Sequence, residues 1–163
     1  MRRTAVLAGS VAIALASGGV LAVTGGAETA PSGTTLQYVT KGGIFKFVDA
    51  APRAKGEEDA SSGDAFLLSI GVYSTSGKRV GSVDAHCSFT RGGRRSRGVC
   101  TGIYDLPDGE LHLSAQLSAD DTVAGAVVGG TGAYVGARGT FKSVDRPGEA
   151  GGDPSDDTIT LLP

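Results

Sequence analysis

Residues 127–142 read VVGGTGAYVGARGTFK, a stretch with five glycines in eleven residues between two apolar, strand-like runs. Glycine lacks the Cβ that disfavours a positive φ, so such a chain can turn sharply, bulge or pass close to a neighbouring strand. We therefore predict a corner of a β-sheet here. Within Gly130–Gly136 the third glycine comes one residue too late for G-x-G-x-x-G, and no helix is predicted after it. Both features argue against a dinucleotide-binding loop.

Short strand-like runs extend outward from this corner at the spacing of about 8 to 12 residues that is typical of barrels and sandwiches. Thr75–Lys78 and Pro107–Gly109 are turn sequences, because glycine accepts a left-handed backbone and Pro-Asp presets the approach. In 111–118 apolar residues alternate with polar ones, the pattern of a strand with one apolar face. The predicted strands are 36–39, 44–49, 65–74, 79–90, 98–106, 110–119, 123–128, 138–145 and 158–162.

No helical pattern is recognisable after the N-terminal segment, so the predicted fold class is all-β. An antiparallel meander of about eight strands can hide its edges by closing on itself. We predict a single closed antiparallel barrel over 36–163, in which 50–64 is a polar surface loop. A barrel of this size is either filled by its own side chains or holds one small ligand. Alternation alone leaves open which strand face lines the lumen.

The N-terminus is typical of a bacterial export signal. Arg2 and Arg3 precede an apolar run over 5–23, and small residues lead to a predicted cleavage site after Ala27. Residues 28–35 are interpreted as a flexible lead-in. The apolar run is also long enough to span a bilayer, so an uncleaved membrane anchor is the alternative. We expect a secreted protein, and association with the cell envelope is the alternative.

Charge and composition exclude several classes of partner. Loss of the signal lowers Lys+Arg from 15 to 13 against 17 Asp+Glu, a net charge of −4, which argues against a nucleic-acid partner. His86 and His112 lack the clustered spacing of metal ligands. The acidic pairs Asp120-Asp121 and Asp156-Asp157 are interpreted as solvated loop residues. We therefore expect no metal and no cofactor.

The chain has two cysteines, which in an exported protein suggest a disulfide. Cys87 and Cys100 lie in two strand-like runs that an arginine-rich turn separates. If the hairpin turns at Gly93-Arg94, the two cysteines face each other at a Cα separation that a disulfide tolerates. The alternative is two thiols that are buried separately.

The motif G-G-T-G-A-Y-x-G-A-R-G at 129–139 resembles the C-terminal signature of the dirigent and allene oxide cyclase families, small antiparallel β-barrels that hold an apolar ligand in the lumen. The segment 77–87 is similar to the K-R-V-G-x-x-x-G-L-C segment of the plant cyclases. The resemblance implies a barrel that binds a small hydrophobic or phenolic molecule and steers its cyclisation or coupling without a redox centre of its own. It also implies a homo-oligomer, a dimer or a trimer.

The same resemblance implies site residues. By position, Cys87 matches the lumen cysteine of the cyclases, whereas Gly43–Asp49 offers neither residue of the E-x-N that these enzymes carry on their first strand. Phe47-Val48-Asp49 resembles the aromatic and Asp segment of the dirigent proteins. Arg138 matches the arginine of A-R-G, and Tyr134 replaces the aromatic residue that follows G-G-T-G.

Polar groups on the predicted strands are candidates for acting on a ligand. A carboxylate in the lumen has a raised pKa and can shuttle a proton, and an arginine can hold an enolate or phenolate oxygen. A structural ion pair or a hydrogen bond at the rim is the alternative for each. Asp84 and His86 share a strand face opposite to Cys87, so the three line one lumen only if a bulge intervenes. The candidate catalytic residues are Asp49, Arg138, Asp84 and Cys87, and the candidate ligand-binding residues are Phe47, His86, Tyr104 and Tyr134.

Two hypotheses about function follow. The first is a secreted barrel that binds a small apolar or phenolic molecule and, as an isomerase or cyclase without a cofactor, steers its cyclisation or coupling. The second is a non-catalytic barrel whose outer surface binds other copies or the cell envelope. The missing E-x-N pair and a disulfide at Cys87 favour the second, whereas the glycine-rich signature favours the first.

Overall fold

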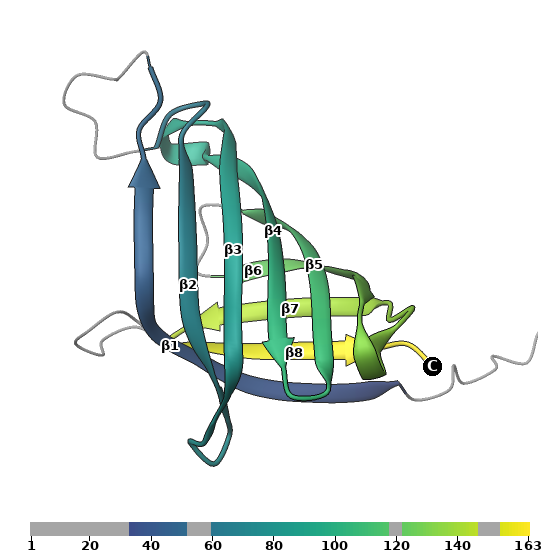
Figure 1. Ribbon diagram of the computed structural model, residues 1–163. Coiled ribbons are helices and arrows are strands. Elements are labelled where there is room, and N and C mark those ends of the chain that lie inside the picture. The colour runs from purple at the N-terminus through teal and green to yellow at the C-terminus, as the bar shows by residue number, and fades with distance from the viewer. Residues whose placement is uncertain (1–32, 52–59, 118–121, 147–153) are drawn as a thin grey trace, which may run out of the picture. The chain divides into compact units, whose positions relative to one another are not determined.

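The computed structural model describes residues 33–51, 60–117, 122–146 and 154–163. Eight strands pair in chain order, each antiparallel to the next, and β8 pairs with β1 to close a barrel (Figure 1). This confirms the predicted all-β closed barrel. The strands are β1 (Thr34–Val48), β2 (Ala65–Ser74), β3 (Arg79–Arg91), β4 (Arg97–Leu106), β5 (Gly109–Leu117), β6 (Thr122–Gly130), β7 (Gly139–Asp145) and β8 (Ser155–Leu161).

Some predicted segments lie wholly or partly outside the described residues. They are the signal at 1–27, the lead-in up to residue 32, the part of the surface loop at 52–59, and residues 118–121, which include the end of the predicted strand 110–119 and the acidic pair Asp120-Asp121. Residues 31–163 form one compact unit. In the part of the chain that the structure describes, no helix is long and apolar enough to cross a membrane.

The first strand differs from its prediction. The sequence predicts two short runs around Lys41-Gly42-Gly43, but the structure has one long strand with a register shift between Lys41 and Gly43. The chain pairs with β8 only before this point, over Thr34–Thr40, and with β2 on both sides of it. In Figure 1, β1 accordingly bends from the direction of β8 into that of β2. A Cβ on Gly43 would lie 2.1 Å from the carbonyl oxygen of Ser69, so only glycine allows this close approach.

The glycine-rich segment forms the predicted corner. The strand β6 ends at Gly130, a short 3₁₀ helix η2 (Gly132–Tyr134) follows, and β7 begins at Gly139. Gly132 and Gly136 have φ values of 57° and 75°, a left-handed backbone that glycine adopts at little cost. The corner turns the chain from β6 into β7, and both strands run across the direction of β2 to β5 (Figure 1).

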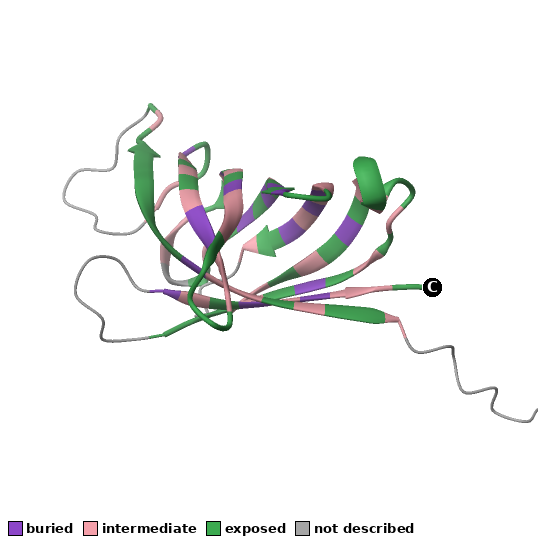
Figure 2. Ribbon diagram, turned by 60° about the horizontal axis from the view of Figure 1, so that its bottom comes forward, coloured by how far each residue is buried: buried purple, intermediate pink, exposed green. Residues whose placement is uncertain are grey.

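Alternate residues of each strand point into the barrel. Buried and exposed residues therefore follow one another along the strands, as the purple bands of Figure 2 show. The core is assembled from all strands, with Leu111, Ile159 and Val72 fully buried. Cys87 and Cys100 pair directly across β3 and β4 and form the predicted disulfide, so the alternative of two separate thiols is excluded. Both sulfur atoms belong to the inward face.

A candidate ligand-binding lumen

The barrel lumen contains a cavity of about 280 Å³. Its walls are mostly apolar, and the disulfide forms part of them. The volume lies just below the range of about 300 to 1,000 Å³ that is common for small-molecule sites. The apolar lining residues are Phe66, Leu68, Ile70, Val83, Ala85, Leu113, Ala115, Leu117, Val123 and Phe141.

One acidic side chain lies inside this apolar lumen. Asp157 on β8 is 2% exposed, and the hydroxyl of Tyr104 on β4 donates a hydrogen bond of 2.6 Å to its Oδ2. Its other oxygen, Oδ1, has no hydrogen-bond partner among the described residues. Buried polar atoms are nearly always hydrogen-bonded in proteins, and the hydroxyls of Ser143 and Thr40 lie close enough to this carboxyl group to favour its ionised form.

Burial sets the acid–base properties of this pair. It raises the pKa of Asp157, and the nearby hydroxyls of Ser143, Tyr104 and Thr40 offset part of the rise because they favour the carboxylate. Burial and the charge of Asp157 likewise raise the pKa of Tyr104 well above its usual value. Asp157 therefore holds its proton at a higher pH than an exposed aspartate does, while Tyr104 stays a hydrogen-bond donor.

Aromatic rings lie on both sides of Tyr104. Its ring centroid is 6.4 Å from that of Tyr38 on β1 and 6.0 Å from that of Phe141 on β7. Burial and the neighbouring Tyr134 hydroxyl raise the pKa of Tyr38, so both phenols stay neutral at ordinary pH. The buried carboxyl group of Asp157 thus lies near aromatic rings.

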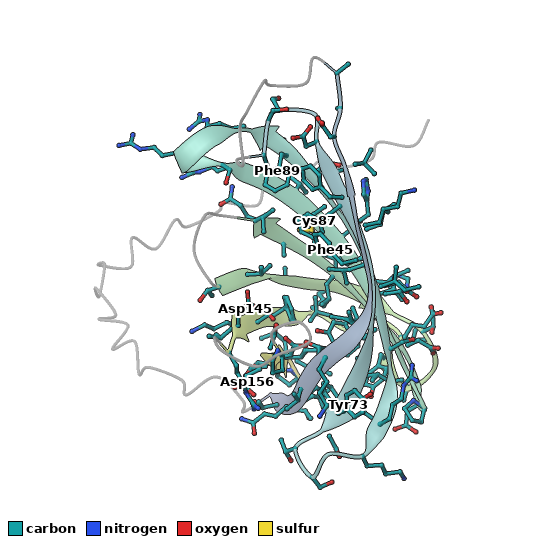
Figure 3. The ribbon with its side chains drawn as sticks, turned by 90° about the vertical axis from the view of Figure 1, so that its left-hand side faces the viewer. Phe45, Tyr73, Cys87, Phe89, Asp145 and Asp156 are labelled. Carbon is teal, nitrogen blue, oxygen red and sulfur yellow. A yellow bond between two sulfur atoms is a disulfide. The ribbon has the colours of Figure 1, made fainter. Side chains whose placement is uncertain are left out.

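A second aromatic group lies at the other end of the inward face. Phe45 and Phe66 have ring centroids 5.2 Å apart, and Phe66 and Phe89 follow at 6.0 Å. Figure 3 shows Phe45 and Phe89 near Cys87, on the opposite side of the barrel from Asp156. Phe47 pairs with Phe66 across β1 and β2, and Phe45 is 64% exposed. This cluster forms an apolar approach to the cavity, since Phe66 also lines it.

The structure places the predicted site residues in three environments. Tyr104 and Cys87 line the lumen, although Cys87 is bonded to Cys100 and has no free thiol. Asp84 and His86 are exposed on the outer face, as their alternation with Cys87 predicts. The remaining four lie near the ends of strands: Asp49 and Arg138 are exposed, Phe47 is partly exposed at the approach, and Tyr134 packs against the core from η2.

The sequence interpretation missed the buried acid. The sequence predicts that Asp156 and Asp157 are solvated loop residues; the loop assignment is wrong for both, and the solvation is wrong for Asp157. Both lie in β8, where Asp156 is exposed and bound to Arg146 while Asp157 faces inward beside Tyr38 and Ser143. The signal was present in the alternation of the last strand, because Asp157 shares a face with the buried Ile159.

The raised pKa of Asp157 gives a stability prediction. A carboxyl group whose pKa is raised by folding favours the folded state below its unfolded pKa, and this contribution is lost as the pH rises through the folded value. Asp157→Asn keeps an acceptor for Tyr104 and cannot ionise. The variant should be more stable than the wild type near pH 8, and the gain should shrink toward about pH 4.

Urea denaturation of both proteins across this pH range measures the difference. Asp156→Asn is the matched control. Arg146 lowers the pKa of Asp156, so removal of the Asp156 charge should give no gain in stability at high pH. A stability difference between Asp157→Asn and wild type that does not change with pH would contradict a raised pKa of Asp157 in the folded protein.

A larger hollow of about 760 Å³ lies on the outer face of β1 to β6. Asp84, His86 and His112 contribute to it, together with exposed apolar side chains. The titratable groups that line it are exposed or half-buried on the outer face, whereas the lumen holds the buried acid Asp157. We therefore place the candidate site in the lumen and treat the outer hollow as a surface.

The fold matches those of several solved structures, while no family model and no curated protein matches the chain. A pyocyanin demethylase superposes with a TM-score of 0.67 at 20% identity, over 79% of this chain and 100% of that one. A pterocarpan synthase dirigent protein gives 0.62 at 18% identity, over 78% and 88%. An exo-specific intermolecular Diels-Alderase gives 0.58 at 17% identity, over 79% and 98%. The likeness confirms the predicted dirigent-like and allene oxide cyclase-like barrel fold.

Proposed function

We propose that this protein is an exported barrel that binds one small, largely apolar or phenolic molecule in its lumen and steers the cyclisation or coupling of that molecule. The observation that carries the proposal is a largely apolar cavity in the lumen whose lining includes the buried acid Asp157. The similar structures include a dirigent protein and a Diels-Alderase, and this supports small-molecule chemistry in such a barrel. The disulfide is typical of exported proteins.

The lumen supplies two contributions to such a reaction. Its apolar walls exclude water and restrict the conformations of a flexible substrate, which lowers the entropic part of the barrier. Asp157 exchanges a proton with the substrate, and the hydrogen bond from Tyr104 to Oδ2 holds its carboxyl group in place. We assign the proton transfer to Asp157 and not to Asp49 or Arg138, because these two are exposed and outside the described lining of the cavity.

Native mass spectrometry after incubation with a hydrophobic metabolite extract tests the proposal. We expect the wild-type barrel to retain one small molecule per chain. The same experiment on Gly102→Leu, in which the lumen is filled, should recover none. If no small molecule is retained by the wild type, or if both proteins retain the same one, the lumen is not the binding site.

The outer face supports the alternative function, a non-catalytic binding barrel. Several large apolar side chains on this face are between 42% and 70% exposed. Single exposed apolar residues are normal on a protein surface, but a group of them on one face marks an interaction site. We name them the outer-face patch, which consists of Ile44, Leu67, Val99, Ile103 and Val128. Lys46 and Asp84 lie on the same face and provide opposite charges, as a self-complementary contact between two copies requires. We propose that this patch makes the barrel a homo-oligomer.

Substitutions in the outer-face patch test this association. Leu67→Asp and Ile103→Asp together should shift the protein to a monomer, because they place two charges in an apolar contact. Analytical ultracentrifugation measures the mass. Val135→Asp is the control, since Val135 is 77% exposed but lies outside the patch, and it should leave the mass unchanged. A wild-type monomer would contradict the proposal.

A further inference from the structure

A hairpin tip with a high density of positive charge lies at one end of the barrel. Residues 91–97, which join β3 to β4 through the short 3₁₀ helix η1 (Gly93–Arg95), read RGGRRSR, four arginines in seven residues. Arg91, Arg95 and Arg97 are exposed, and none of the three makes an ion pair with another described residue. The chain without its signal carries a net charge of −4, so this arginine tip is a local exception in an acidic protein.

Exposed apolar side chains lie at the same end of the barrel. Pairing through β2 places Val48, the last residue of β1, level with Ser88 on β3, three residues before Arg91. Figure 1 accordingly shows the end of β1 and the connection between β3 and β4 together at the upper end of the barrel. Phe45, Phe47 and Val48 are 64%, 46% and 41% exposed. None of them belongs to the outer-face patch.

Several acidic side chains at this end of the strands are bonded elsewhere or lie away from the arginine tip. Asp64 is buried and accepts hydrogen bonds from two backbone N–H groups, and Arg146 binds Asp156. Figure 3 shows Asp145 and Asp156 on the side of the barrel away from Phe89, which shortly precedes the tip. The positive charge of the tip is therefore available to an anionic partner.

We propose that the arginine tip and the end of β1 dock together on the surface of an anionic lipid bilayer. The guanidinium groups bind lipid phosphates, while Phe45, Phe47 and Val48 enter the boundary between the headgroups and the acyl chains. Electrostatic attraction combined with buried apolar area is what holds peripheral proteins at such surfaces. A soluble polyanion would use the arginines and would leave the three apolar side chains in water, so the bilayer is the partner that fits both features.

Docking in this orientation turns the apolar approach to the cavity toward the bilayer. The approach consists of Phe45, Phe66 and Phe89, of which Phe66 lines the cavity. An apolar molecule dissolved in the lipid would then reach the lumen without crossing water. The docking itself requires no ligand in the lumen, so it is tested independently of the proposed function.

Co-sedimentation with lipid vesicles measures the interaction. Residues 31–163 form one compact unit that contains all eight strands and the disulfide, and they lack the N-terminal apolar run, which could bind lipid by itself. We expect this unit to sediment with vesicles of phosphatidylglycerol and phosphatidylcholine in equal parts, and to stay in solution with phosphatidylcholine alone. Raising the salt from about 0.1 to about 1 M should release it, because the Debye length falls from about 10 to about 3 Å.

Two pairs of substitutions locate the contact. Arg95→Gln with Arg97→Gln should lower the partition coefficient at least about tenfold, since each basic residue near an anionic surface contributes about fivefold. Lys78→Gln with Arg79→Gln is the matched control, because it removes the same charge from exposed residues at the opposite end of β2 and β3. It should leave binding within about twofold of the wild type. Thermal denaturation checks that both variants are folded.

Phe45→Ala separates a bilayer from a soluble polyanion. It should weaken binding to the anionic vesicles at least about fivefold, because a large apolar side chain no longer enters the lipid. Val135→Ala is the control, since Val135 is 77% exposed but lies at the corner at the opposite end of β6 and β7, and it should leave binding unchanged.

Three outcomes would overturn the inference. The wild-type unit does not sediment with the anionic vesicles, or the two charge variants lose binding equally, or Phe45→Ala binds as tightly as the wild type while the arginine variant does not. In the third case the arginine tip binds anions without entering a bilayer, and a soluble polyanion is the partner. None of these outcomes bears on the proposed function, which retention of a small molecule in the absence of lipid tests.

Discussion

Replacing Gly102 by Leu should abolish ligand binding in the lumen while the barrel stays folded. Gly102 lies on the inward face of β4 between Cys100 and Tyr104, and it lines the cavity. A Cβ at this position would lie 3.4 Å from the Cβ of Ala85, an ordinary van der Waals contact. The rest of the leucine side chain must then extend into the space that the ligand occupies. We expect the affinity for any lumen ligand to fall by at least about 100-fold.

Gly129→Leu is the matched control for this variant. Gly129 lies on β6, and a Cβ there would have no described atom within 4 Å. The same change of residue should therefore leave ligand affinity unchanged. Circular dichroism and thermal denaturation check that both variants are folded, and titration with 1-methylnaphthalene measures the affinity. Equal affinities of Gly102→Leu and Gly129→Leu would show that the ligand does not bind in the lumen.

Reduction of the disulfide should lower the free energy of unfolding by about 3 kcal/mol, the loop-entropy value for a ring of this size. Cys87 and Cys100 are 13 residues apart in sequence and join adjacent strands. The bond stabilises the protein mainly by restricting the conformations of the unfolded chain. In the folded state the hairpin is also held by the backbone pairing of β3 and β4. Both cysteines are buried, at 3% and 7% exposed, so the reduced sulfur atoms would still pack in the core.

Urea denaturation with and without reductant measures this loss. The double variant Cys87→Ala and Cys100→Ala should have lower stability than the oxidised wild type, and its stability should not respond to reductant. The slope of the transition is compared as well, because a larger slope indicates a more expanded unfolded chain. A wild type that is equally stable in both conditions would mean that the bond contributes nothing to the fold.

Local sequence signals predicted most of the barrel. Turn sequences and strand alternation depend only on residues that are close together in the chain. The structure has hairpins at both predicted turns, 75–78 and 107–109, and the alternation predicted for 111–118 lies in β5. The pairing of Cys87 with Cys100 also followed from spacing within one hairpin. The bulge in β1 could not be predicted in this way. Gly42-Gly43 fits a turn equally well, and only the pairing with β2, more than twenty residues later, makes it a bulge.

The site was predicted only in part, for a similar reason. Tyr104 was recognised as a polar group on a clear strand. Asp157 was missed because it follows a Gly/Pro/Asp loop and adjoins a second acid, a context typical of solvated residues. Its inward direction depends on pairing with Tyr38 and Ser143, from strands far away in the sequence. A shift of one residue in this register would have buried Asp156 in its place.

A crystal structure of the wild-type protein with bound 1-methylnaphthalene tests the central claim most directly. The account predicts that the rings lie inside the barrel, beside Tyr104 and Phe141 and within reach of Asp157. A lumen filled by its own side chains, with the probe absent or bound on the outer face of β1 to β6, would contradict it.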